Sequence, residues 1–169
     1  AAFERVVNEP KRGLGATSLT RLRELANRLN VSYMKAIESI ELAPSITTKA
    51  ASKFLTFAEM MHNLRQQSEF LNVTELTELV MTQSGYRQML AEKNDPDSQA
   101  RLENLEEFLS VTKEFDDKYQ PEDPESIDPV TDFLGTTALM SDLDDFEEGD
   151  GAVTLMTLHA AKGLEFPVV

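Results

Sequence analysis

The sequence predicts a mainly α-helical protein that ends in one β-strand from an incomplete α/β domain. Apolar side chains recur at helical spacing through most of residues 1–148. Between Val153 and Leu158 they form instead a β-rich, largely apolar run, which is typical of a parallel-sheet strand buried on both faces. A single strand cannot build a sheet, so we expect the chain to be part of something larger. We divide it into a helical domain, residues 1–148, and a linker, strand and turn, residues 149–169.

Composition limits the classes of function. A chain of 169 residues holds one domain, or one domain and a fragment. It has no cysteine, which excludes a disulfide framework and a thiolate metal site, and its two histidines, His62 and His159, are too few for a histidine cluster. No apolar run has the length of a membrane helix, and the first residues do not resemble a signal peptide. We therefore expect a cytoplasmic protein with no metal site and no membrane partner.

Charge is unevenly distributed along the chain. The net charge of −14 argues at first against nucleic-acid binding, because Lys and Arg carry most contacts with phosphate. However, residues 1–35 contain seven basic and three acidic residues, whereas residues 114–150 contain fourteen acidic residues and one lysine. The acidic excess is therefore local, and the N-terminal quarter can be a contact surface.

A glycine turn lies in this basic quarter. A short apolar and basic segment ends at Glu9-Pro10, and Lys11 and Arg12 precede the turn Gly13-Leu14-Gly15. Two glycines around one aliphatic residue allow positive φ and close backbone approach. Free N–H groups at the start of the following helix suit an anion, which favours contact with DNA phosphate. A plain helix connector with solvated charges is the alternative.

Two helices are predicted directly after this turn. The first carries an apolar stripe of leucines; we expect Thr17 or Ser18 to cap it, and it ends at Asn30. Ser32 caps the second, which ends near Pro44.

The longest helix is predicted to begin at Thr47 or Thr48 and to end at about Leu71. Its apolar stripe indicates core positions rather than platforms for base stacking. The stripe consists of Phe54, Phe57, Met61 and Leu64. His62 lies beside the stripe and is expected at the surface.

Three further helices are predicted before the acidic region. One begins at Thr74 and ends at Ser84-Gly85, a short one covers Tyr86–Glu92, and the next begins at Pro96 or Asp97. The last of these has an apolar face made of Leu102, Leu105, Phe108 and Leu109. Its carboxylates have no partners that would make a glycosidase or metal site, so we expect a solvated acidic face at Glu103, Glu106 and Glu107.

The acidic region contains one more predicted helix. Residues 116–128 are acidic and proline-rich, which indicates a mobile loop. The helix covers about residues 129–140, with inward side chains at Val130, Phe133, Leu134 and Leu139. Residues 141–151 are acidic too, but they lack the spacing of an EF-hand calcium loop, so a linker is favoured.

The predicted C-terminal strand is followed by a segment of small and polar residues, His159 to Gly163. Such strand ends carry ligand chemistry in α/β proteins, and the segment Thr157–Phe166 closely resembles motif V of the superfamily 1A DNA helicases of the UvrD/PcrA/Rep type. The preceding chain resembles the helical 2B subdomain of such an enzyme from a Gram-positive bacterium. Supporting stretches are Phe3–Ser18, Ser84–Leu90 and Ser98–Val111.

The resemblance implies a parent enzyme that moves along DNA in the 3′-to-5′ direction, in DNA repair and plasmid replication, with ATP and Mg²⁺ as cofactors. It also implies that the 2B subdomain regulates unwinding and contacts duplex DNA at a junction with single-stranded DNA. The backbone contacts map onto Lys11, Arg12, Gly13, Leu14 and Gly15. Protein partners are also possible on such an insertion.

Motif V lies in the second motor subdomain, 2A, of this family. The resemblance assigns Glu165 and Gly163 to nucleotide binding, and Thr157 and His159 to single-stranded DNA; ordinary surface residues at a strand end are the alternative. The sequence has no Gly-x-x-x-x-Gly-Lys-Ser/Thr phosphate loop. We therefore expect this chain alone to bind no cofactor, hydrolyse no ATP and unwind no DNA.

Two other functions remain open at this point. An acidic helical module that binds a partner protein would use the 116–150 region instead of Lys11 and Arg12. A fragment of a recombination nuclease-helicase subunit shares the motor motifs, but its 2B region is usually larger and more diverged.

Overall fold

The computed structural model describes residues 2–93, 95–120 and 128–143. It confirms the mainly helical fold class, and no strand occurs in these ranges. The chain divides into two compact units, Ala1–Phe133 and Leu134–Val169, and of the second unit only residues 134–143 are described. The predicted terminal strand, with Thr157, His159, Gly163 and Glu165, lies outside the described residues. No helix in the described part is long and apolar enough to cross a membrane.

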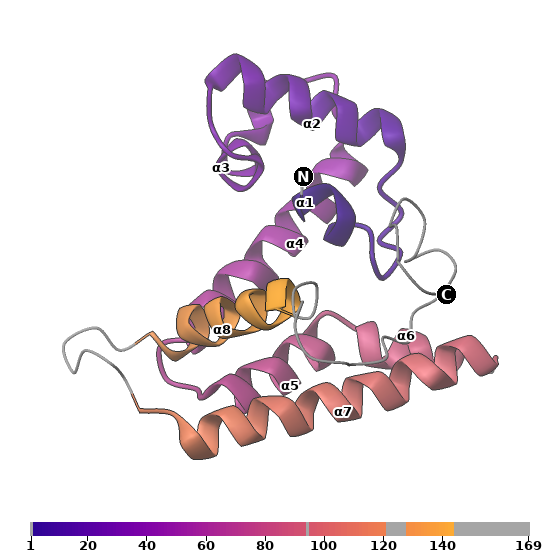
Figure 1. Cartoon of the computed structure of the whole chain (residues 1–169). Helices are drawn as coiled ribbons and strands as arrows, with labels where there is room; N and C mark the ends of the chain where they lie inside the picture. The colour runs from indigo at the N-terminus through magenta and orange to yellow at the C-terminus, as the bar shows by residue number, and fades with distance from the viewer. Residues whose placement is uncertain (1, 94, 121–127, 144–169) are drawn as a thin grey trace, which may run out of the picture. The chain divides into compact units, whose positions relative to one another are not determined.

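The described residues form eight α-helices and one 3-10 helix (Figure 1). They are α1 Ala2–Val6, α2 Ala16–Leu29, α3 Tyr33–Glu38, η1 Ile40–Leu42, α4 Thr48–Gln67, α5 Val73–Gln83, α6 Tyr86–Glu92, α7 Pro96–Lys118 and α8 Pro129–Leu143. The short helix at Tyr86–Glu92 has the predicted bounds. The predicted helix from Ser32 to near Pro44 is divided into α3 and η1, and the segment before the glycine turn contains the unpredicted helix α1.

The main apolar core joins α1, α2, α3 and α4. Phe54 is fully buried and Phe57 is 3% exposed, which confirms that the aromatic residues of α4 are core residues. The prediction was wrong for Met61, which is 39% exposed. Met60 packs against the core instead, and it lies about 100° around the helix from Met61. His62 is exposed, as predicted.

Several helix ends lie at their predicted caps. The side chain of Ser32 accepts a hydrogen bond from the N–H of Lys35 at the start of α3. Thr47 accepts one from the N–H of Ala50 at the start of α4. Asn30 ends α2 in the left-handed conformation, with φ of 53°. These caps are local features, so a short stretch of sequence specifies them.

The start of α2 was predicted wrongly. The helix begins at Ala16, with Gly15 in extended conformation as its N-cap residue, so neither Thr17 nor Ser18 caps it. The last glycine of the turn is thus itself the N-cap residue, and Thr17 and Ser18 lie inside the helix.

The connection from α4 to α5 also differs from its prediction. Asn72 accepts a hydrogen bond from the N–H of Glu75, whose side chain accepts one from the N–H of Asn72 in return. This capping box places the start of α5 at Val73, one residue before the predicted Thr74. Helix α4 ends at Gln67, four residues before the predicted Leu71, and the extended Asn72 starts the next helix.

The helices α5, α6 and α7 pack side by side (Figure 1). The carboxylate of Asp116 on α7 accepts hydrogen bonds from Val73 N at 3.1 Å and Thr74 N at 2.8 Å, at the start of α5. The predicted mobile loop from 116 was therefore wrong for residues 116–118, which continue α7. Residues 121–127 lie outside the described part of the chain.

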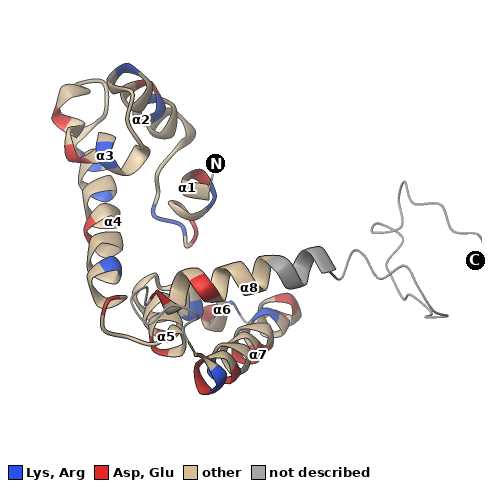
Figure 2. Cartoon of the chain, turned by 60° about the vertical axis from the view of Figure 1, so that its left-hand side comes forward, with Lys and Arg blue, Asp and Glu red and all other residues tan. Residues whose placement is uncertain are grey.

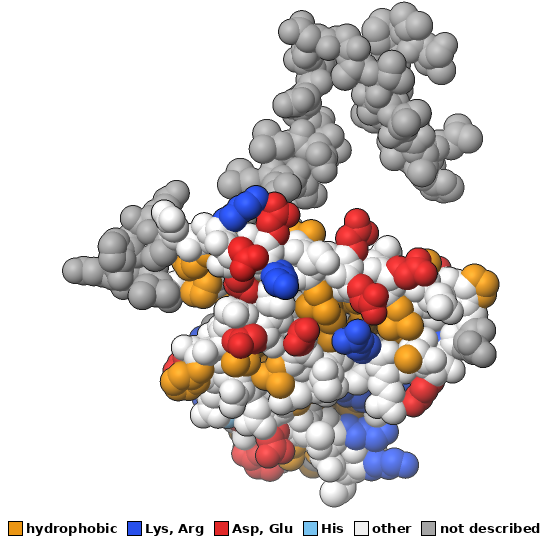
Figure 3. Space-filling model, turned by 90° about the horizontal axis from the view of Figure 1, so that it is seen from below, with side chains coloured by type: hydrophobic (Ala, Val, Ile, Leu, Met, Phe, Trp, Pro, Cys, Tyr) orange, Lys and Arg blue, Asp and Glu red, His pale blue; other side chains and the backbone are white. Residues whose placement is uncertain are grey.

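Acidic side chains cover the exposed face of α7. Glu103, Glu106 and Glu107 are exposed, which confirms the solvated face. Figure 3 shows this side of the molecule, with Asp and Glu spread among smaller basic and apolar patches. Leu102, Leu105 and Leu109 are half-buried as predicted, but Phe108 is 38% exposed.

Helix α8 begins within the first unit. Phe133 is 6% exposed and lies edge-on to Phe115, at 5.1 Å between ring centroids. Leu134 was predicted to face inward but is 61% exposed, because consecutive helical residues point about 100° apart. Val130 is half-buried, and the side chain of Leu139 lies outside the described residues.

Candidate nucleic-acid interface

One of the two glycines of the turn has the positive φ that the sequence allows, and Gly15 is extended instead. Gly13 has φ of +66°, which a residue with a side chain rarely adopts. Leu14 is 2% exposed and belongs to the core, whereas Gly13 and Gly15 are exposed. The buried leucine therefore anchors the turn, and the two glycines present its backbone to solvent.

Helix α2 begins with unused backbone donors. The N–H groups of Ser18 and Leu19 both donate to the carbonyl of Gly15. In the described part of the chain, no acceptor meets the N–H groups of Ala16 and Thr17, and no side chain caps the helix. These donors and the positive end of the helix dipole attract an anion.

The space above these donors is open. A Cβ atom added at Gly15 would meet no other atom within 4 Å. Helices α3, α4, α5 and α7 differ from α2, because side chains of Ser32, Thr47, Asn72 and Asp95 accept bonds at their starts. Within the described part of the chain, α2 is thus the long helix at whose start no side chain accepts a hydrogen bond.

Two lysines flank this helix start. Lys11 is exposed in the turn itself. The ammonium of Lys53 on α4 donates to the carbonyl of Gly13 at 3.0 Å, which uses one of its three donors. The sequence interpretation missed Lys53, because nothing local connects residues forty positions apart. Figure 2 shows the basic residues of α2 and α4.

Arg12 has a different environment from Lys11. Its Nη1 lies 3.2 to 3.3 Å from the carbonyl oxygens of Val6, Val7, Glu9 and Pro10. Its Nη2 donates to the carbonyl of Ser84 at 3.1 Å, and the guanidinium lies 5.1 Å from the centre of the Phe57 ring. Burial lowers the pKa of Arg12 below its usual value, and the nearby charge of Glu9 offsets part of this shift. The predicted phosphate partner is therefore bound to its own chain.

Asn8 closes the turn from the other side. Its side-chain oxygen accepts hydrogen bonds from the N–H of Arg12 at 2.9 Å and from the N–H of Leu14 at 3.3 Å. Its side-chain nitrogen donates to the carbonyl of Leu14 at 3.1 Å. Three bonds from one amide hold the two ends of the turn together.

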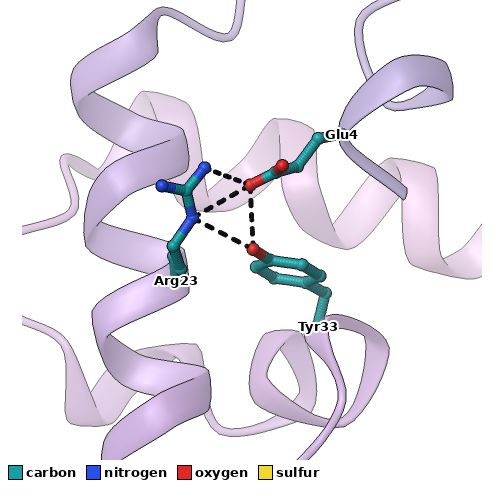
Figure 4. Close-up of polar contacts among 3 residues, drawn as sticks. All are labelled: Glu4, Arg23 and Tyr33. Atoms are coloured by element: carbon teal, nitrogen blue, oxygen red, sulfur yellow. Dashed lines mark hydrogen bonds and ion pairs between the residues drawn. The ribbon is translucent and has the colours of Figure 1, made fainter. Parts of the chain in front are cut away.

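Helix α1 is attached to α2 and α3 by a polar cluster (Figure 4). Glu4 accepts hydrogen bonds from the guanidinium of Arg23 and from the hydroxyl of Tyr33, the latter at 2.8 Å. The bond with Arg23, and then that with Tyr33, lowers the pKa of Glu4. Phe3 also stacks on Tyr33 at 4.7 Å. The cluster fixes the helix from which the turn emerges.

A cleft of about 420 Å³ lies beside the turn, between residues 9–11 and α6. Its charged lining is mixed, with Glu9 and Glu92 beside Lys11 and Lys93. No set of three metal-ligating side chains occurs in the described ranges.

Comparison with known proteins identifies the family of the chain. The model of the UvrD-like helicase C-terminal domain matches residues 1–169. The chain belongs to this family. This confirms the resemblance to superfamily 1A helicases of the PcrA/UvrD type.

Three relatives of this UvrD-like chain carry the same name, ATP-dependent DNA helicase PcrA. The chain is 99% identical to that of Leuconostoc citreum over 169 residues, 42% identical to that of Bacillus subtilis over 174 residues, and 37% identical to that of Staphylococcus epidermidis over 168 residues. The alignments cover 99 to 100% of this chain and 22 to 23% of the relatives. The chain therefore spans less than a quarter of their length.

Proposed function

We propose that this chain is the duplex-contacting, regulatory part of a bacterial, cytoplasmic ATP-dependent 3′-to-5′ DNA helicase of the PcrA type. The names of its relatives support the parent activity. The observation that carries the DNA contact is the uncapped start of α2, where the N–H groups of Ala16 and Thr17 face solvent beside Lys11 and Lys53.

The chemistry of this surface suits a phosphate of the DNA backbone. Backbone N–H groups fix the position of one phosphate, and lysines add charge without sequence preference. Gly15 lets the sugar-phosphate chain approach the protein backbone closely, because a Cβ there would meet no atom within 4 Å, whereas at Gly13 the ammonium of Lys53 occupies that space. Leu14 contributes by holding the turn in the core. Such contacts bind a duplex beside its junction with single-stranded DNA whatever its sequence.

The overall negative charge does not oppose this proposal. Helix α7 carries seven acidic and three basic residues, whereas α2 carries three arginines and one glutamate. Counterion release depends on the cations at the contact, so a locally basic turn suffices.

For the C-terminal segment, outside the described residues, we keep the roles that the resemblance implies. Glu165 and Gly163 would contact the nucleotide, and Thr157 and His159 would contact single-stranded DNA. The described residues bring no three metal ligands together, and the sequence has no phosphate loop. ATP and Mg²⁺ would therefore be held mainly by other parts of the full-length protein.

The test uses the full-length helicase and a duplex with a single-stranded tail. Lys11→Ala and Lys53→Ala should each weaken junction binding and lower the slope of log K against log salt by about one. Lys113→Ala is the matched control, because it removes an exposed lysine from the acidic helix α7.

Unchanged affinity and slope in both Lys11→Ala and Lys53→Ala would contradict the DNA contact. The alternative, a module that binds a partner protein through its acidic residues, predicts this result. It also predicts that Asp117→Asn on α7 weakens capture of that partner.

A further inference from the structure

We propose that Arg12 is a positioning residue that holds the glycine turn against the α5–α6 turn and does not itself contact DNA. This inference rests on the proposed function of the turn. From the sequence, both Lys11 and Arg12 were expected to contact the DNA backbone. One cation of the pair faces the ligand, and the other faces the protein.

The acceptors of Arg12 come from both sides of an interface within the first unit. Four are carbonyls of residues 6–10, just before the turn, and the fifth is the carbonyl of Ser84, 72 positions away. A planar guanidinium has donors in fixed directions, so it can join both sides at once. Removing Arg12 would leave the Ser84 carbonyl without this link to the turn.

Two further contacts hold Arg12 in place. The guanidinium lies over the ring of Phe57, which is 3% exposed, at a distance typical of a cation–π contact. The backbone N–H of Arg12 donates to Asn8. Arg12 is thus held at its backbone and at its guanidinium, and reaching a phosphate would break the contacts at the guanidinium end.

The α5–α6 turn, Ser84-Gly85, also lies close to this loop. Gly85 has φ of +77°, and a Cβ added there would lie 4.0 Å from the ring of Pro10. Pro10 and Gly85 also line the same cleft, so the α5–α6 turn lies beside the segment that leads into the glycine turn. The free N–H groups at the start of α2 are therefore placed relative to α5 and α6, and Arg12 is the charged link between them.

Charge and geometry can be separated by experiment. Arg12→Lys keeps the positive charge but cannot supply the planar set of donors, whereas Arg12→Met removes the charge. In the full-length helicase, both variants should weaken binding to the tailed duplex on the order of tenfold, with the salt slope unchanged. Lys11→Ala is the comparison, because a direct phosphate contact should lower the slope by about one.

A second variant tests the link from the other side. Gly85→Ala removes no charge but strains the left-handed turn. It should weaken junction binding with the salt slope unchanged. Gly135→Ala is the matched control, because a Cβ there meets no atom within 4 Å, and it should leave binding unchanged.

Backbone order gives an independent readout. In Arg12→Lys, the amides of residues 13–17 should exchange hydrogen faster, while those of α7 keep their rates. If Arg12→Met does not fold, Arg12→Lys and Gly85→Ala decide the question.

The positioning role is overturned if Arg12→Lys binds as the wild type does, or if Arg12→Met lowers the salt slope as Lys11→Ala does. The second result would also make Arg12 a direct phosphate contact, and both results leave the proposed function standing as long as Lys11→Ala weakens binding. If Lys11→Ala, Lys53→Ala and the Arg12 variants are all silent, the DNA contact itself is wrong.

Discussion

The helices α1–α4 and the helices α5–α7 are held together in different ways. Thirteen buried apolar residues form one core cluster between Val7 and Phe57. From α5 to α7 the buried residues are Val73, Met81, Leu90, Ser98 and Thr112, and two of these five are polar. The first region depends mainly on apolar burial, whereas the second combines a thin core with hydrogen-bonded helix ends.

The difference explains how α2 can be stable although its first backbone N–H groups have no partner in the described part of the chain. In α5 and α7, carboxylate and amide side chains satisfy the first N–H groups, at Asn72, Asp116 and Asp95. Helix α2 has no such acceptor among the described residues, but it buries Leu22 and Leu25. Its burial stabilises it enough to leave two backbone donors exposed. Those donors are the ones that we assign to the DNA backbone.

The largest effect should come from the core of the first region. Phe54→Ala is expected to lower the free energy of unfolding by about 3–5 kcal/mol, because it removes a fully buried ring and leaves a cavity. Urea unfolding of the purified chain measures this. Phe70→Ala is the control: Phe70 is 81% exposed, so its loss should change stability by less than about 0.5 kcal/mol. Equal effects would remove the contrast between core and surface.

A smaller effect is expected from the helix ends of the second region. Asp116→Ala removes the acceptor for Val73 N and Thr74 N, and for the Thr74 hydroxyl at 2.5 Å. It should lower the free energy of unfolding by about 0.5–2 kcal/mol, the range for a lost N-terminal cap. Asp117→Ala removes a neighbouring exposed carboxylate and should be nearly neutral. Similar values for the two variants would show that Asp116 is no cap.

The smallest change in stability should come from giving α2 a cap. Gly15 is extended and a Cβ there has open space, so Gly15→Asp can accept hydrogen bonds at the helix start. It should raise the free energy of unfolding by a few tenths of a kcal/mol. In the full-length helicase it should weaken DNA binding, because a carboxylate then occupies the phosphate position.

Gly15→Ser separates capping from charge. It should give a similar gain in stability and a smaller loss of DNA affinity than Gly15→Asp, since the serine hydroxyl is neutral. An unchanged DNA affinity in Gly15→Asp would show that the start of α2 does not bind phosphate.

Local features of the fold were predictable from the sequence. The periodic stripe placed Phe54 and Phe57 in the core, and Ser32, Thr47 and Asn30 mark helix ends as predicted. Each of these signals acts over one or two helical turns, so the residues that decide it are neighbours in sequence. The positive φ at Gly13 belongs to the same class.

The errors have the opposite character. Asp116 was assigned to a loop because its neighbours are acidic, and the structure makes it the cap of a helix that begins 43 residues earlier. Met61 was assigned to the core because it continued the spacing, but Met60 is the methionine that packs against the core. For Asp116 the deciding partner comes from another helix.

The sequence by itself determined that the chain is helical, that its N-terminal quarter is basic, and that a glycine turn opens α2. It also carried the resemblance that the family match confirmed. The tertiary structure decided which cations stand at that turn. It brought Lys53 to the carbonyl of Gly13 and turned Arg12 toward Ser84. Backbone conformation follows from neighbouring residues, whereas the partner of a long charged side chain depends on which distant segments the packed core brings within its reach.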